Sequence, residues 1–285
     1  MFKLVLFISL FLASTALKIT LLNLSSFDAI DSYFVAAANR WEEIITSDLS
    51  DYYVFSGYWL GEDYSYFDYD GFVDDILIAY DFQTMPPEFL AGTAVALKRD
   101  DPDDYYYYGF PLTSYIVVNI SNIQNMIDNG TLYDTILHEM GHALGFGSLW
   151  PTKNGCASPF SKYYGGLDSC LASLLYYLYT ADDLEIETDL GEGSAYSHWD
   201  EDQLGNELMT PTSDANSPIT LVTLYAFRDL GYSVDYSKAD SFSEVIPENR
   251  RKMKESGTKH YSHHNDIIRG KTRGASEIGA YMIKK

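Results

Sequence analysis

The segment L-Y-D-T-I-L-H-E-M-G-H-A-L-G-F, residues 132 to 146, decides most of what this sequence predicts. Its apolar residues recur every three or four positions, as on one side of a helix. Gly145 or Gly147 is available to end that helix. We therefore predict an amphipathic helix whose buried side consists of Leu132, Ile136, Leu137, Met140, Ala143 and Leu144.

Within this helix, His138, Glu139 and His142 form the pattern H-E-x-x-H. Helix positions four apart lie about 40° apart around the axis, so both imidazoles can reach one ion. A catalytic zinc ion takes three protein ligands and leaves a position for water, whose pKa it lowers to about 7. Glu139 would then accept the proton of that water and pass it to the leaving group. The alternative is a solvated helix with two unrelated histidines, which the apolar surroundings disfavour.

A third ligand has to come from elsewhere in the chain. Up to Asp240 the sequence holds one further histidine, His198, so we expect His198 to complete the zinc site. Glu201 and Glu207 are the competing acidic ligands. The remaining histidines lie in the C-terminal tail, where a fixed ligand geometry is harder to maintain, at His260, His263 and His264.

The rest of the sequence predicts an α+β chain. Helical spacing of apolar residues recurs over residues 27–45 and 218–230. Runs of β-branched and aromatic residues predict strands of one sheet at residues 75–80, 93–97 and 115–120. The Tyr- and Asp-rich segments 51–70 and 100–108 show neither period and are expected to be exposed loops or sheet edges. Their clustered aspartates favour a solvated acidic surface over a calcium site, because their spacing matches no calcium loop.

The two ends of the chain differ from its body. Residues 1–16 combine a lysine, an apolar run and small residues before Leu17, which predicts a cleaved signal peptide. The apolar run is shorter than the roughly 20 residues of a membrane-spanning helix. We therefore expect a protein without a transmembrane anchor, either secreted or in the lumen of the secretory pathway.

Residues 17–240 carry 36 acidic and 8 basic side chains, whereas residues 241–285 carry 10 basic and 5 acidic ones. This change predicts a separate basic tail that is largely mobile.

The cysteines and the net charge narrow the choice of partners and compartment. Cys156 and Cys170 are the two cysteines, and export makes a disulfide the expected state, with two buried free thiols as the alternative. A disulfide closing this loop would stabilise the fold by about 3 kcal/mol. The acidic body repels phosphate backbones, so nucleic acid is not an expected partner.

Three sequence segments resemble the leishmanolysin family of metzincin zinc peptidases: H-E-M-G-H-A-L-G-F at 138–146, S-H-W at 197–199 and E-L-M-T at 207–210. Most metzincins place the third histidine three residues after the glycine that Gly145 matches, where this chain has Ser148. Leishmanolysins carry an insertion there, and His198 follows His142 by 56 positions, which fits that arrangement.

The resemblance implies a metzincin-like fold in two lobes. Residues 17–147 would form an N-terminal lobe with a mixed sheet and the active-site helix, and residues 148–240 a mainly helical or irregular lobe. It also implies that Met209 forms a methionine turn beneath the metal. The larger members block their zinc with a propeptide cysteine, and no cysteine precedes Cys156 here, so we do not expect that form of latency.

These observations predict a secreted zinc-dependent endopeptidase that acts on peptide or protein substrates. A zinc-dependent amidase on a non-protein substrate would use the same residues and stays open. A secreted binding or adhesion protein with a structural metal is the other alternative. Glu139 argues against it, because a structural site needs no base.

Overall fold

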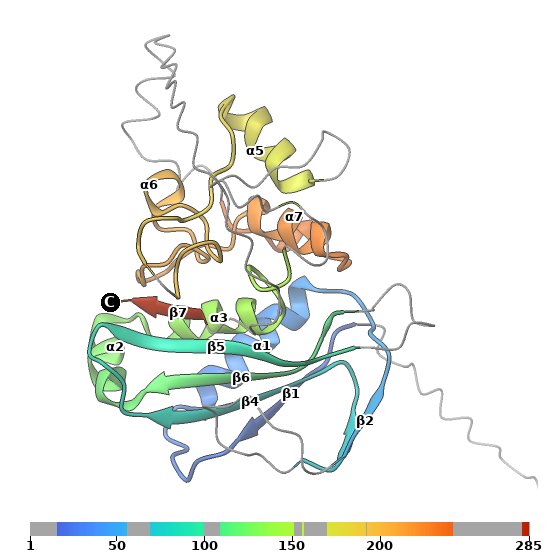
Figure 1. The fold of residues 1–285 in the computed structure, drawn as a ribbon, viewed down its shortest axis with the longest axis vertical. Coiled ribbons are helices and arrows are strands. Elements are labelled where there is room, and N and C mark those ends of the chain that lie inside the picture. Colours follow the sequence, from blue (N-terminus) through green and yellow to red (C-terminus); the bar gives the residue numbers. More distant parts are fainter. Residues whose placement is uncertain are drawn as a thin grey trace, which may run out of the picture.

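Figure 1 shows the fold in a computed structural model, with a sheet on one side of helix α3 (Leu132–Ala143). On the other side lie helices α5 (Leu171–Thr180), α6 (Glu201–Leu204) and α7 (Leu221–Leu230). The structure describes residues 16–55, 69–99, 109–150, 156, 170–191, 193–241 and 281–284.

Within the described residues, the sheet contains five strands in the order β1-β4-β6-β5-β7. Strands β1 (Ile19–Asn23), β4 (Ile76–Gln83) and β6 (Pro111–Asn119) are parallel. Strand β5 (Phe89–Lys98) runs antiparallel to β6, and β7 (Tyr281–Lys284) runs antiparallel to β5 on its other side. The sheet is therefore mixed, as predicted, and the three predicted strands overlap β4, β5 and β6.

The three predicted helices are confirmed, each a few residues shorter than predicted: α1 (Asp31–Ile44), α3, and α7 (Leu221–Leu230). The remaining described elements are shorter or were not predicted. They are β2 (Tyr52–Val54), β3 (Gly71–Val73), η1 (Ile120–Asn122), α2 (Ile123–Asn129), α5 (Leu171–Thr180), α6 (Glu201–Leu204) and η2 (Tyr236–Lys238).

Both faces of the sheet are covered, which explains why its central strands are mainly apolar. Alternate residues of β4 point to opposite faces. Ile76 and Ile78 join the core beneath the helices, whereas Leu77 and Ala79 pack with residues of the antiparallel pair β2–β3. Helix α3 is thus seated on a sheet that is buried on both sides.

Two hydrogen bonds fix the position of α3. The indole Nε1 of Trp41 in α1 donates to the carbonyl oxygen of Leu137 at 2.9 Å. The hydroxyl of Ser114 in β6 donates to the carbonyl oxygen of Ala143, at the end of the helix, at 2.8 Å. Trp41 also packs against Phe227 of α7, with ring centroids 4.9 Å apart. The helix is therefore held by the sheet and by α1, and α1 in turn packs against α7.

The predicted disulfide between Cys156 and Cys170 is confirmed, with Cα atoms 5.8 Å apart. The signal peptide prediction falls, apart from Ala16, outside the described residues. The same holds for the aspartates from 100 to 104 and for the tail from 242 to 280. In the part of the chain that the structure describes, every helix is too short or too polar to cross a bilayer.

Candidate metal centre

The structure brings together the three histidines that the sequence singled out. His138 and His142 lie on consecutive turns of α3, and His198 comes from an irregular segment between α5 and α6. All three side chains are buried, with 1% or less of their surface exposed. Their Nε2 atoms form a nearly equilateral triangle, 3.0 Å from His142 to each of the others and 3.1 Å from His138 to His198.

The other ring nitrogen of each histidine faces a backbone carbonyl oxygen. Nδ1 of His138 lies 2.6 Å from the oxygen of Leu208, and Nδ1 of His198 lies 2.8 Å from that of Ser194. Nδ1 of His142 lies 3.0 Å from the oxygen of Phe146. A carbonyl oxygen only accepts, so each Nδ1 carries the proton and each Nε2 presents a lone pair.

Three lone pairs at this separation repel one another unless a cation lies between them. Burial lowers the pKa of His138 to about 4 and places the pKa values of His142 and His198 well below the ordinary value, so all three rings are neutral at pH 7. A tetrahedral zinc ion with Zn–N bonds of 2.0–2.1 Å requires nitrogen separations of about 3.3 Å, close to those observed. Among the described residues these three histidines form the one group of side chains suited to hold a metal ion.

Local backbone geometry explains how His142 obtains its partner. Gly145 adopts a φ of 106°, a left-handed conformation that favours glycine. The chain therefore reverses directly after α3, and the amide of Phe146 donates to the carbonyl oxygen of Gly141 at 3.0 Å. The same reversal brings the carbonyl oxygen of Phe146 to the His142 ring.

Glu139 lies beside the histidines with one carboxylate oxygen fixed and one available. The hydroxyl of Thr93 in β5 lies 2.5 Å from Oε2 of Glu139 and 3.1 Å from its carbonyl oxygen. Oε1 is buried and has no hydrogen-bond partner among the described residues. Burial raises the pKa of Glu139 to about 8, although the Thr93 hydroxyl acts in the opposite direction. Such a carboxylate is suited to accept a proton and to release it again.

Met209 is fully buried and packs against the turn of α3 that carries His138 and His142. A Cβ atom added at Gly141 would lie 2.7 Å from Sδ of Met209 and 2.9 Å from its Cε. Gly141 is therefore needed for this close approach. Met209 thus packs against α3 at the turn between His138 and His142, and its role as a methionine turn stays a prediction.

The two acidic alternatives to His198 have other partners. Oε2 of Glu201 accepts from the amide of Thr212 at 3.3 Å, and the carboxylate of Glu207 accepts from the amide of Met209 at 2.6 Å. Neither belongs to the metal-competent group. Sequence reasoning missed Thr93, which was predicted only as part of a strand, and nothing in its local sequence marks it as a partner of Glu139.

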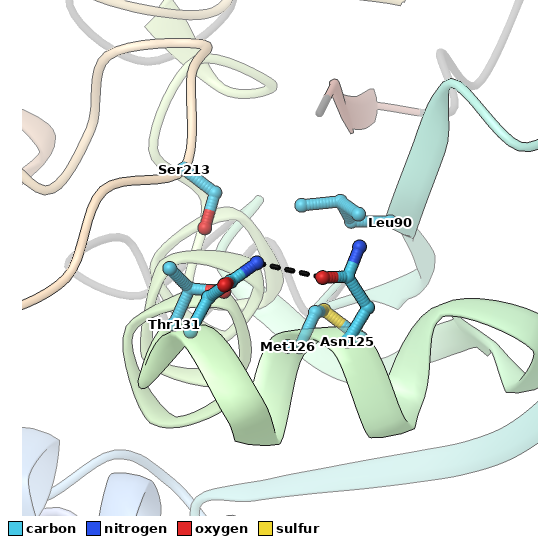
Figure 2. A pocket seen from close by; sticks show the side chains of 6 residues that line it. Leu90, Asn125, Met126, Thr131 and Ser213 are labelled. Carbon is cyan, nitrogen blue, oxygen red and sulfur yellow. Dashed lines mark hydrogen bonds between the residues drawn. The ribbon is translucent and has the colours of Figure 1, made fainter.

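A small cavity lies near the start of α3 (Figure 2), lined by Leu90, Asn125, Met126, Asn129, Thr131 and Ser213. Its volume is about 70 Å³. Thr135, one helical turn before Glu139, has its hydroxyl 2.9 Å from that of Ser213, which links the cavity wall to the helix. None of the histidines lines this cavity, so it is separate from the metal centre.

Comparison with known proteins agrees with this site. The family model described as leishmanolysin matches residues 169–247. The leishmanolysin of Leishmania major is 31% identical over 150 residues, which are 49% of this chain and 24% of that protein. The leishmanolysin of Leishmania donovani is 32% identical over 143 residues, 46% of this chain and 24% of that protein. Over about half of its length the chain is thus a distant homologue of the leishmanolysins.

A leishmanolysin homolog of Crithidia fasciculata is 28% identical over 142 residues, 46% of this chain and 21% of that protein. The chain thus covers about a quarter of the length of the leishmanolysins it matches. The leishmanolysin family is zinc-dependent, and the buried histidine triad with Glu139 fits its H-E-x-x-H zinc site. The mixed sheet with the triad at α3 is likewise consistent with the metzincin fold.

Proposed function

We propose that this chain is a secreted zinc-dependent endopeptidase in which His138, His142 and His198 bind the metal and Glu139 is the catalytic base. The observation that carries the proposal is the convergence of three unprotonated Nε2 atoms next to a carboxylate with one unpartnered oxygen. A binding protein with a structural metal would need the histidines but not this carboxylate.

Each residue has a defined task in peptide hydrolysis. When bound, zinc polarises the substrate carbonyl and lowers the pKa of the attacking water. Oε1 of Glu139 accepts the proton of that water, while Thr93 holds Oε2 and so fixes the plane of the carboxylate. The burial that raises the pKa of Glu139 lets it keep the proton until the leaving amine takes it.

The proposal extends to the organisation and location of the chain. Residues 1–16 act as a signal peptide, residues 17–147 and 148–240 form the two catalytic lobes, and residues 241–285 form the basic tail. The disulfide between Cys156 and Cys170 supports export, because such bonds persist in oxidising compartments. Peptides or proteins as substrates follow from the family, and an extended peptide would lie between the lobes.

The decisive experiment compares the chain with its Glu139→Gln variant. Zinc content is measured on both proteins, and cleavage is followed on an unbiased mixture of peptides. We expect one zinc per chain in both and internal peptide cleavage in the unsubstituted chain only, because Gln keeps the shape but cannot accept the proton. A fully active Glu139→Gln variant would refute the role of the base. A zinc-loaded chain that cleaves no peptide would refute the peptidase assignment.

A further inference from the structure

Glu207 is a buried carboxylate of the C-terminal lobe that takes no part in the proposed chemistry. It is 1% exposed and accepts four hydrogen bonds. Its Oε2 accepts from the amide of Met209 at 2.6 Å. Its Oε1 accepts from the amide and hydroxyl of Thr220, both at 3.1 Å, and from the hydroxyl of Thr223 at 2.5 Å. Burying a carboxylate costs free energy unless it is hydrogen-bonded, and these four bonds offset that cost.

One branch of this network leads to His138. The bond from Met209 to Glu207 closes the turn of residues 207–210, in which the amide of Thr210 also donates to the Glu207 carbonyl oxygen at 3.1 Å. Between these residues lies Leu208, whose carbonyl oxygen accepts from Nδ1 of His138. The direction of that carbonyl therefore depends on a turn that the Glu207 side chain holds closed.

A second branch leads to His198 through its neighbour Trp199. The backbone amide of Trp199 donates to the carbonyl oxygen of Met209 at 3.0 Å. Its indole Nε1 donates at 2.8 Å to the hydroxyl of Thr223. A threonine hydroxyl has a single proton, which Thr223 gives to Glu207, so a lone pair remains for the indole. Both the backbone and the ring of Trp199 are thus tied to the same carboxylate.

We propose that Glu207 is a positioning residue that sets the orientation of two of the three metal-binding histidines, His138 and His198. The inference rests on the proposed zinc site. His142 is independent of Glu207, because its partner Phe146 belongs to the chain reversal directly after α3. Partners that orient metal ligands in this way typically change metal affinity 10- to 100-fold when they are removed, and we expect a change of about that size.

The variant Glu207→Gln separates positioning from packing because it keeps the size of the side chain. Its single amide oxygen can still accept from Thr220 and Thr223, but its NH2 group then faces the amide of Met209, so two donors oppose each other. A second variant, Thr223→Val, leaves the Met209 bond intact and removes the link to the indole of Trp199. It keeps the inference testable should the first variant fold poorly.

The matched control is Asp75→Asn. Asp75 is equally buried, with 1% of its surface exposed, and its carboxylate also accepts from two backbone amides, those of Lys18 and Leu49. It precedes β4 and has no hydrogen-bonded path to the histidines through the network described above. Asp75→Asn is therefore expected to change the free energy of unfolding without changing zinc affinity.

The experiment measures the zinc dissociation constant of each protein by competition with a chelator. The absorption spectrum of the cobalt-substituted protein is recorded as well, because it reports ligand geometry. We expect Glu207→Gln to weaken zinc binding about 10- to 100-fold and to alter the cobalt spectrum, and Thr223→Val to do so more weakly.

Three results would overturn the inference. The first is a dissociation constant of Glu207→Gln within twofold of the unsubstituted chain. The second is an equal loss of zinc affinity in Asp75→Asn, which would show general destabilisation instead of positioning. The third is an unsubstituted chain that binds no zinc at all, and this result alone would also refute the proposed function.

Discussion

The hydroxyl of Thr93 offers the most direct test of how Glu139, the proposed catalytic base, is held. We predict that Thr93→Val, which replaces the hydroxyl by a methyl group of similar size, lowers kcat. A hydrogen bond to a charged group contributes about 1.5–3 kcal/mol. Since each 1.36 kcal/mol of activation free energy is a factor of ten, loss of the bond to Glu139 corresponds to about a 10- to 150-fold lower kcat.

The assay is steady-state cleavage of a peptide at saturating zinc, with zinc affinity measured on the same proteins. Thr93 contacts Glu139 and none of the histidine rings through the hydrogen bonds described, so zinc affinity should stay unchanged. Thr93→Ser is the matched control, because it keeps the hydroxyl and should retain most of the activity. A Thr93→Val enzyme with unchanged kcat, or a Thr93→Ser enzyme that is equally slow, would refute the assigned role.

Three further perturbations test the surroundings of the site. Gly141→Ala is expected to lower the free energy of unfolding by about 1–3 kcal/mol, because its Cβ overlaps Met209. In denaturant unfolding, Gly141→Ala should lower that free energy less when it is introduced into a Met209→Ala background, where the overlapping side chain is gone. Burial raises the pKa of Asp75 from 3.8 to about 6, so the folded chain keeps a proton that the unfolded chain has lost. The free energy of unfolding should therefore fall as the pH rises from about 4 to 6. If the free energy of unfolding of Asp75→Asn falls with pH as steeply as that of the unsubstituted chain, Asp75 is not the cause. Finally, β7 pairs with the edge of β5 that carries Thr93, so a chain ending at Asp240 leaves this edge free for an extended peptide. Its KM for peptides should fall at unchanged zinc affinity, and an equal KM would show that β7 does not compete with substrate.

The predictable part of the site is the part that local sequence encodes. His138, Glu139 and His142 could be placed together because helical spacing alone puts them on adjacent turns. His198 could be added because it is the one histidine up to Asp240 besides His138 and His142. That inference needs no knowledge of the fold.

The partners of these residues could not be predicted, because they come from distant parts of the chain. Thr93 lies 46 positions before Glu139, and Leu208 lies 70 positions after His138. From its sequence Glu207 is a candidate metal ligand, since residue type alone cannot distinguish a carboxylate that binds an ion from one that closes a turn. Only the direction of the hydrogen bonds around it makes that distinction.

Helix α5 was missed for a different reason. Its sequence, L-A-S-L-L-Y-Y-L-Y-T, is apolar on nearly every side and so lacks the alternation of apolar and polar faces that predicts a surface helix. Only Ala172 and Tyr176 of this helix are fully buried, while Tyr177, Leu178 and Tyr179 are exposed. Which residues of such a helix are buried depends on its packing against α7, so they cannot be predicted from the sequence of the helix itself.

The three histidines differ in how far their orientation depends on the rest of the molecule. The carbonyl partners of His142 and His198 lie four residues away in the chain, whereas the partner of His138 lies 70 positions away. An intact α3 therefore presents both of its histidines, but only His142 has its second ring nitrogen held by the adjacent chain. The H-E-x-x-H helix becomes a three-ligand site only when the turn at residues 207–210 closes over it, so disturbance of that turn should weaken metal binding while the helix remains folded.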